Sequence, residues 1–253
     1  MHRFYVSDIS EAEKSIIISG GDVNHIANVL RLSVGDEITV SDGTSRDYLC
    51  RITEIDTKDK HEVTADIVDV FDSNAELPVL VYLFQGVPKG DKLETVIQKN
   101  IELGCHEVIP VMMERTVVKL DDKKKKHKQA RYQGIAESAA KQSGRGIIPE
   151  IREYMTFDEA VRYAADMDYI LVPYESAEGM IYTRKLLNDI ASSDYDGKKI
   201  AVFIGPEGGF SLTEIKKLEE KNAKIFTLGH RILRTETAGM TVMSILSYLF
   251  END

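Results

Sequence analysis

The sequence predicts an α/β protein with a smaller β-rich module at its N-terminus. Residues 3–70 hold short runs of β-branched residues separated by turns such as Gly20-Gly21 and Asp42-Gly43, which is the pattern of a small barrel. After Pro78, apolar strands alternate with amphipathic helices, and this alternation is typical of a mostly parallel sheet. We therefore predict a first domain at residues 1–72 and a second at 78–253.

The N-terminal module is predicted to contain strands where Val, Ile and Thr are frequent, at residues 15–19, 36–43, 48–55 and 61–70. One helix is predicted at residues 23–31, because its apolar residues recur on one face and Asp22 is a candidate N-cap. The segment FDSNAELP, which ends at Pro78, is the predicted linker.

The C-terminal domain is predicted to contain strands at residues 79–84, 107–113, 169–173, 199–205 and 224–229. Helices are predicted between and after them, at residues 92–103, 129–142, 157–166, 180–190, 211–220 and 237–250. Ser211 and Glu214 form a capping box that fixes the start of one helix. Thr235, Glu236 and Thr237 are candidates to open the last one.

Composition excludes several classes of protein. No apolar run reaches the roughly 18 residues of a membrane span, and the N-terminus lacks a signal-peptide pattern, so we expect a cytoplasmic protein without membrane attachment. Cys50 and Cys105 are isolated and indicate neither a disulfide framework nor a metal site. The net charge of −10 argues against a generally basic, nucleic-acid-coating surface. A local basic face is still compatible with it.

The run DDKKKKHK, which begins at Asp121, is the one low-complexity patch. It is interpreted as a solvated loop or helix start. The alternative is a phosphate-attracting patch in an otherwise acidic protein.

Two unusual loops follow consecutive predicted strands. GPEGGF occupies residues 205–210, and LGHRILRTETA occupies residues 228–238. Taken alone, GPEGGF could be only a tight turn. Because ligands of open α/β sheets bind at the carboxyl ends of the strands, two such loops predict one shared pocket, to which residues 172–175 contribute from a third strand.

Familiar phosphate-binding motifs do not fit these loops. GPEGGF lacks the spacing of a dinucleotide fingerprint, and GVPKGDK at residues 86–92 lacks that of a P-loop. Glu207 would also repel a phosphate. The acid is better suited to a ligand with hydroxyl or cationic groups, and a dehydrogenase is therefore disfavoured.

These two loops resemble the cofactor-binding half of SPOUT-class RNA methyltransferases, and most closely the RsmE family, which methylates N3 of a uridine in 16S ribosomal RNA. The similarity continues in order over most of the chain, through HIANVLR (25–31), QGVPKGDKLETVIQKNIELG (85–104), PVMMERTVV (110–118) and ESAAKQSGR (137–145). It implies a PUA-like N-terminal β-barrel, a SPOUT-type α/β fold with a trefoil knot, S-adenosylmethionine as methyl donor, and a homodimer with its pocket near the subunit interface. Ribosomal RNA or the small ribosomal subunit is the implied partner.

The resemblance also implies the site residues. The cofactor is expected against Leu171, Val172, Pro173, Gly205, Pro206, Glu207, Gly208, Gly209, Leu228, Gly229, Arg231, Ile232 and Leu233. Arg234 is expected to stabilise charge on a uracil oxygen, and Glu207 or Glu236 to accept the N3 proton, although the arginines could instead pair with these acids. RNA contacts are expected at Arg31, Lys89, Lys92, Arg115, Gln142 and Arg145.

Two alternatives stay open. The chain could be a SPOUT methyltransferase acting on another RNA nucleotide, or a non-catalytic RNA-binding ribosome-assembly factor that retains the fold. The intact loops favour an enzyme, because a pure binder needs no methyl-donor pocket. If the donor lies against GPEGGF, Gly208→Val should block it by filling that space.

Overall fold

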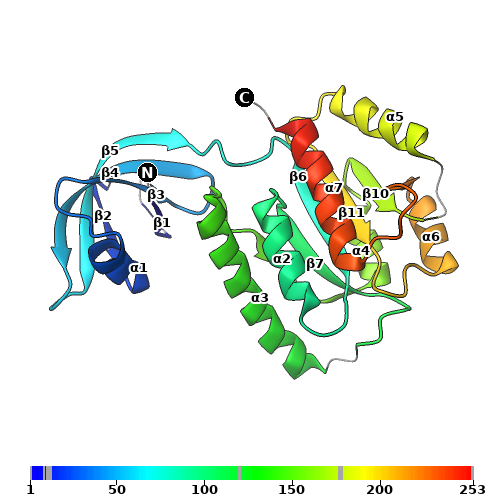
Figure 1. The fold of residues 1–253 in the computed structure, drawn as a ribbon, viewed down its shortest axis with the longest axis horizontal. Coiled ribbons are helices and arrows are strands. Elements are labelled where there is room, and N and C mark those ends of the chain that lie inside the picture. The colour runs from blue at the N-terminus through cyan, green and yellow to red at the C-terminus, as the bar shows by residue number, and fades with distance from the viewer. Residues whose placement is uncertain (1, 8, 10–12, 119–120, 176–178, 252–253) are drawn as a thin grey trace. The chain divides into compact units, whose positions relative to one another are not determined.

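The chain forms two compact units (Figure 1). The computed structural model describes residues 2–7, 9, 13–118, 121–175 and 179–251. The N-terminal unit combines Met1–Glu76 with Ala140–Ile148, and the C-terminal unit combines Leu77–Ala139 with Pro149–Asp253. Nothing in the sequence pattern signals that residues 140–148 join the N-terminal unit.

The N-terminal unit is built on a curled sheet that, among the described residues, has five strands in the order β1-β3-β4-β5-β2. The strands are β1 (Arg3–Tyr5), β2 (Ser15–Ser19), β3 (Glu37–Ser41), β4 (Arg46–Asp56) and β5 (Glu62–Asp72). β1 runs parallel to β3, and the other neighbours are antiparallel. Alternate apolar residues, among them Ile16, Ile38 and Ile52, are fully buried in its core. β5 ends at Asp72, so the first two residues of the predicted linker, Phe71 and Asp72, belong to this strand.

The helical segment of this unit begins earlier than predicted. α1 (Gly21–Asn24) has Gly20 as its N-cap, with a φ of 72° that favours glycine, so the predicted capping role of Asp22 is wrong. Asp22 lies in the first turn and its carboxylate is 3.4 Å from Lys141 Nζ. A π-helical turn, η1 (His25–Val29), follows, and Arg31 then adopts a φ of 55°.

A buried ion pair holds the second segment of the N-terminal unit. Arg145 is only 3% exposed, and its Nε donates to both carboxylate oxygens of Glu76 at 2.9 and 3.0 Å. The same carboxylate accepts from the backbone N–H groups of Gly146 and Ile147. Glu76 therefore fixes the turn that follows the helix α3 (Asp122–Ser143), and removing either partner of the ion pair would leave a buried charge.

The C-terminal unit has the predicted α/β architecture. In the part of the chain that the structure describes, its sheet has seven strands, in the order β12-β10-β11-β6-β7-β8 with β9 also pairing with β7, and every pair is parallel. The strands are β6 (Leu80–Gly86), β7 (Glu107–Met112), β8 (Glu150–Ile151), β9 (Met155–Thr156), β10 (Tyr169–Pro173), β11 (Lys199–Ile204) and β12 (Lys224–Phe226).

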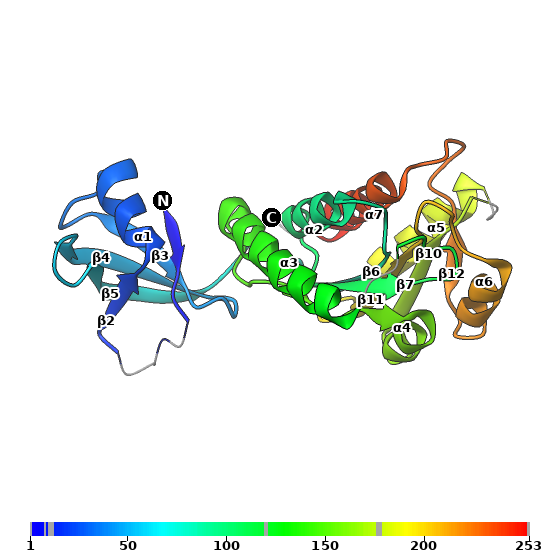
Figure 2. The ribbon, with the colours of Figure 1, turned by 90° about the horizontal axis from the view of Figure 1, so that it is seen from below.

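Helices cover both faces of this sheet (Figures 1 and 2). α2 and α7 lie side by side on one face, and α4 lies on the opposite face. The helices are α2 (Lys92–Glu102), α3 (Asp122–Ser143), α4 (Phe157–Ala164), α5 (Met180–Ala191), α6 (Leu212–Glu219) and α7 (Thr235–Phe250). The rings of Phe84 and Phe203 stack 4.4 Å apart in the core between neighbouring strands.

α3 begins seven residues before the predicted helix, so the lysine run lies in a helix start and not in a loop. The Ser211–Glu214 capping box at the start of α6 and the opening of α7 at Thr235 are confirmed. The trefoil knot stays a prediction. No described helix is long and apolar enough to cross a membrane.

Candidate active site

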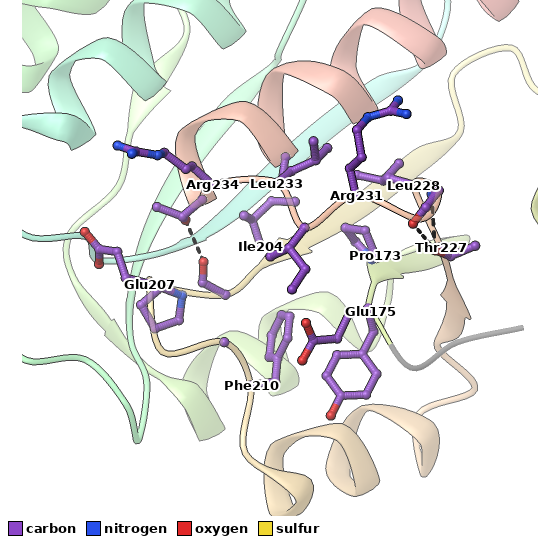
Figure 3. A pocket seen from close by; sticks show the side chains of 18 of the residues that line it. Pro173, Glu175, Ile204, Glu207, Phe210, Thr227, Leu228, Arg231, Leu233 and Arg234 are labelled. Carbon is purple, nitrogen blue, oxygen red and sulfur yellow. Dashed lines mark hydrogen bonds between the residues drawn. The ribbon is translucent and has the colours of Figure 1, made fainter. Parts of the chain in front are cut away.

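A cavity of about 890 Å³ opens at the carboxyl ends of β10, β11 and β12 (Figure 3). Its walls come from the loops after these strands and from the start of α7, and Lys92, Arg115, Gly179 and Met180 add to them from elsewhere in the C-terminal unit. The strand-end residues in the lining include Pro173, Tyr174, Glu175, Ile204, Gly205–Phe210 and Thr227–Thr235. The two loops predicted to share a pocket therefore do so.

Glu207 fastens the glycine-rich loop to the start of α2. Its Oε1 accepts from Lys89 N at 3.1 Å and from Lys92 Nζ at 3.0 Å. Partial burial opposes ionisation of Glu207, but the Lys92 ammonium and the backbone N–H donors outweigh it and lower the pKa of this carboxyl. Glu207 is thus an ionised structural clamp.

Arg115 supports the same loop from the segment after β7. Its guanidinium donates to Gly208 O at 2.9 Å. A Cβ added at Gly208 would lie 2.8 Å from Arg115 Cβ. The predicted Gly208→Val substitution would therefore act indirectly. Its new side chain would collide with Arg115 before it filled the space in which a ligand would lie.

The second loop is anchored to α5. Thr183 Oγ1, which is buried, donates to Thr227 O at 3.0 Å, and Thr227 N donates back to it at 3.3 Å. Gly229 follows with a φ of 112°, a conformation available to glycine at little cost. The chain can therefore turn sharply and present residues 230–234 at the pocket rim.

Arg231 and Arg234 are exposed at this rim. In Figure 3 Arg234 and Glu207 lie toward one end of the pocket and Arg231 toward the other. Within the described residues, neither guanidinium has a carboxylate within 4.0 Å. The alternative that these arginines merely neutralise Glu207 and Glu236 is not what the structure shows.

Glu236 lies in the first turn of α7, outside the pocket lining. Its Oε2 is 3.7 Å from Lys92 Nζ and is buried without a hydrogen-bond partner among the described residues. Lys92 thus neutralises two carboxylates at once.

A sequence model of one family, described as "RNA methyltransferase domain", matches residues 75–247 and so covers this whole sheet and pocket. The chain belongs to the RNA methyltransferase family. A second model, "RNA methyltransferase PUA domain", matches residues 18–71 of the N-terminal unit.

Named relatives of this RNA methyltransferase cover it from end to end. It is 38% identical to "Ribosomal RNA small subunit methyltransferase E" of Bacillus subtilis, over 99% of this chain and 98% of that protein. Among solved structures it resembles a putative methyltransferase from Legionella pneumophila in complex with SAM (TM-score 0.78, 30% identity, 97% and 96% coverage). It also resembles a ribosomal RNA small subunit methyltransferase E from Neisseria gonorrhoeae bound to S-adenosyl methionine (TM-score 0.79, 28% identity, 99% and 98% coverage).

The structure brings most of the predicted cofactor residues of this RNA methyltransferase together in one pocket. The lining contains Pro173, Gly205, Pro206, Glu207, Gly208, Gly209, Leu228, Gly229, Arg231, Ile232 and Leu233, together with Arg234. Leu171 and Val172 do not belong to it, because both are fully buried inside β10. The lining instead begins at Pro173.

The predicted RNA residues lie in different settings. Arg31 and Gln142 are exposed in the N-terminal unit, and Lys89 is exposed in the C-terminal unit. Lys92 and Arg115 line the pocket and hold the GPEGGF loop. The burial of Arg145 against Glu76 argues against an RNA contact for its side chain.

The predicted cofactor residues leave out several lining residues, including Phe210, Thr227 and Thr235. A signal was present for all three, since Phe210 and Thr235 lie inside the two predicted loops and Thr227 directly precedes the second. Among the described residues, no group of three or more His, Cys, Asp and Glu side chains is placed to hold a metal ion.

Replacing Lys92 by methionine should raise the pKa of Glu207. That pKa now lies below its ordinary value of 4.5, so the clamp is complete above pH 4.5 and is lost as the pH falls through the lowered value. In Lys92→Met the loss should begin at a higher pH. Carboxyl carbon NMR titration of Glu207 measures this, with Lys216→Met, at an exposed position of α6, as the control. An unchanged midpoint in Lys92→Met would contradict the clamp.

Proposed function

We propose that the protein transfers a methyl group from S-adenosylmethionine to N3 of a uridine in small-subunit (16S) ribosomal RNA. The observation that carries this proposal is the pocket that the two strand-end loops share, with the Arg234 guanidinium, which forms no ion pair with the described residues, at its rim. The names of its full-length relatives support the RNA substrate, and the two SAM-bound structures support the donor.

The pocket fits such a donor in size and chemistry. Its volume lies within the range of roughly 300–1,000 Å³ usual for small-molecule sites, and Ile204, Leu228 and Leu233 give it apolar walls for an adenine ring. Backbone N–H and C=O groups of the two glycine-containing loops can bind the adenine edge. When bound, the donor supplies an electrophilic methyl group on a sulfonium. The pocket needs no phosphate-binding lysine for this ligand.

Arg234 is the residue that we assign to the acceptor base. N3 of neutral uracil carries a proton, and methylation requires the anion or its stabilisation. A permanently charged guanidinium beside a uracil oxygen stabilises that anion and lowers the pKa of the N3–H group. Arg234 is the N-cap residue of α7, so the helix fixes where its side chain begins.

The two acids predicted to accept the N3 proton fit that role less well. Glu207 already accepts two hydrogen bonds and its pKa is lowered, which makes it a weak base. Glu236 lies outside the pocket lining, and its Oε2 is buried beside Lys92. We therefore propose that the proton passes to solvent once Arg234 has stabilised the uracil anion, and that the two acids position the loop and helix around it.

The RNA must present its target base unpaired, because N3 is hidden in a base pair. We propose that the PUA unit positions this strand, that the enzyme works in the cytoplasm, and that it acts as a homodimer. Ile232 and Tyr248, which are 83% and 86% exposed, are large hydrophobic side chains that a second copy could cover.

Lys89→Gln should weaken RNA binding without changing donor affinity. The side chain of Lys89 is exposed beside the pocket loop, whereas only its backbone N–H holds Glu207. Loss of one phosphate contact should lower the slope of log affinity against log salt by about 0.7–0.9. Salt-dependent RNA binding measures the effect, with exposed Lys221→Gln as the matched control; equal slopes for both variants would remove Lys89 from the RNA surface.

The deciding experiment is incubation of the protein with labelled S-adenosylmethionine and unmethylated small subunits or naked ribosomal RNA, followed by mapping of the modified nucleotide. Methyl on N3 of one uridine supports the proposal. Methyl on another atom would identify a different RNA methyltransferase. Failure to bind the donor at millimolar concentration would leave only an RNA-binding role.

A further inference from the structure

A buried amide lies directly behind the cofactor pocket. Gln85 is the penultimate residue of β6 and is fully buried, with Ile204 of β11 and Pro110 of β7 as its apolar register partners. Its Nε2 donates to Gly86 O at 2.9 Å and to Thr235 Oγ1 at 2.8 Å. Gln85 does not line the pocket, and none of the chemistry assigned so far uses it.

Thr235 carries this contact onward to the glycine-rich loop. Its Oγ1 donates to Gly205 O at 2.6 Å. One hydroxyl thus accepts from Gln85 and donates to Gly205. We call this chain of two hydrogen bonds the Gln85–Thr235–Gly205 relay.

The relay joins three elements that come together only in the fold. Gln85 is the penultimate residue of β6, Gly205 follows β11, and Thr235 is the first residue of α7. Thr235 also directly follows Arg234 in the chain. The relay therefore fixes the first carbonyl of the cofactor loop and the starting point of the Arg234 side chain with one hydroxyl.

A buried glutamine carries a cost that an apolar residue would not. Gln85 Oε1 is buried and has no hydrogen-bond partner among the described residues, and the same holds for Asn100 Oδ1 on α2. Both oxygens face Gly239 of α7, whose added Cβ would lie 3.5–3.7 Å from them. An unsatisfied buried acceptor destabilises the folded state, because it has lost its hydrogen bond to water. Packing alone would favour a leucine or methionine at position 85, so the hydrogen bond that Nε2 donates to Thr235 is the contribution that an apolar residue could not make.

We propose that Gln85 and Thr235 are positioning residues of the methyl-transfer site, which lock the cofactor loop to the start of α7 and so align the donor with Arg234. This inference rests on the proposed function. The relay differs from the Glu207 clamp, which is partly exposed and ties the same loop to α2.

The test replaces the hydroxyl while keeping the shape of the side chain. Thr235→Val removes both hydrogen bonds at nearly constant volume and should weaken S-adenosylmethionine binding about 10-fold and lower kcat by a similar factor. Thr235→Ser keeps the hydroxyl and should stay within about twofold of the wild type. Gln85→Met removes the whole amide but leaves the hydrogen bond from Thr235 to Gly205 in place, so it should give a smaller effect in the same direction.

A double variant tests whether the two residues act as one unit. Because both substitutions break the same chain, Thr235→Val with Gln85→Met should lose less than the product of the single losses. Ser41→Ala is the matched control, since this buried hydroxyl of the N-terminal unit donates to Gly146 O at 3.2 Å. It should lower thermal stability without changing donor affinity.

Calorimetry with S-adenosylmethionine, steady-state methylation and thermal melting together separate the outcomes. Restoration of affinity and kcat by serine, with coupling between positions 85 and 235, supports the relay. Wild-type affinity and kcat in Thr235→Val would overturn it, and so would a loss in melting temperature alone. If the wild type itself binds no donor, the proposed function fails and the role of the relay fails with it.

Discussion

Replacement of Arg234 by alanine is expected to reduce methyl transfer by about 10²–10³-fold, the usual effect of removing one preorganised donor to a developing negative charge. The guanidinium is exposed at the pocket rim and, among the described residues, forms no ion pair. Its removal therefore leaves no buried charge behind, and the free energy of unfolding should change by less than about 0.5 kcal/mol. Donor affinity should change little.

Arg231→Ala is the matched control for this prediction. Arg231 is equally exposed, belongs to the same loop, and lies toward the other end of the pocket in Figure 3. It is expected to weaken donor binding more than it slows the chemical step. Single-turnover methylation at saturating donor separates the two effects; wild-type rates in Arg234→Ala would remove this residue from the chemistry.

The pocket could be predicted from sequence because its elements are local signals. Glycine-rich or arginine-rich loops follow two consecutive apolar strands, and parallel strands end at the same edge of their sheet. Ser211 and Glu214, three residues apart, likewise marked the start of α6, which the structure confirms. Such features need no knowledge of distant contacts.

The support around the pocket could not be predicted in this way. Lys92 precedes Glu207 by 115 residues, and Gln85 precedes Thr235 by 150. A basic residue near a predicted site suggests RNA, yet Lys92 is held between two carboxylates. Arg145 shows the same effect, because its partner Glu76 lies 69 residues earlier in the chain and the pair leaves the guanidinium buried.

Very short elements were missed for a different reason. β8 and β9 have two residues each, and β1 has three. Alternation of apolar and polar residues needs at least four positions to be recognised. These strands form because a longer neighbouring strand supplies backbone hydrogen-bond partners, as β7 does for both β8 and β9.

Gly86→Ala is expected to disrupt the pocket although it adds a single methyl group. A Cβ at this position would lie 2.6 Å from both Cδ and N of Pro206. The obstacle is backbone and a proline ring, neither of which can swing aside as a flexible side chain would. Either the end of β6 or the Gly205–Phe210 loop must move.

Both movements break the same set of supports. Gln85, beside Gly86, holds Thr235, and Thr235 holds Gly205. We expect the free energy of unfolding to fall by about 1–3 kcal/mol, as for other overpacked cores, and methylation to fall by about 10² because the loop is misplaced. Gly134→Ala is the control, since its added Cβ meets nothing within 4 Å on α3 and should be neutral or slightly stabilising. Denaturant unfolding and donor calorimetry on both variants provide the measurement, and wild-type donor affinity in Gly86→Ala would show that the loop does not depend on its approach to β6.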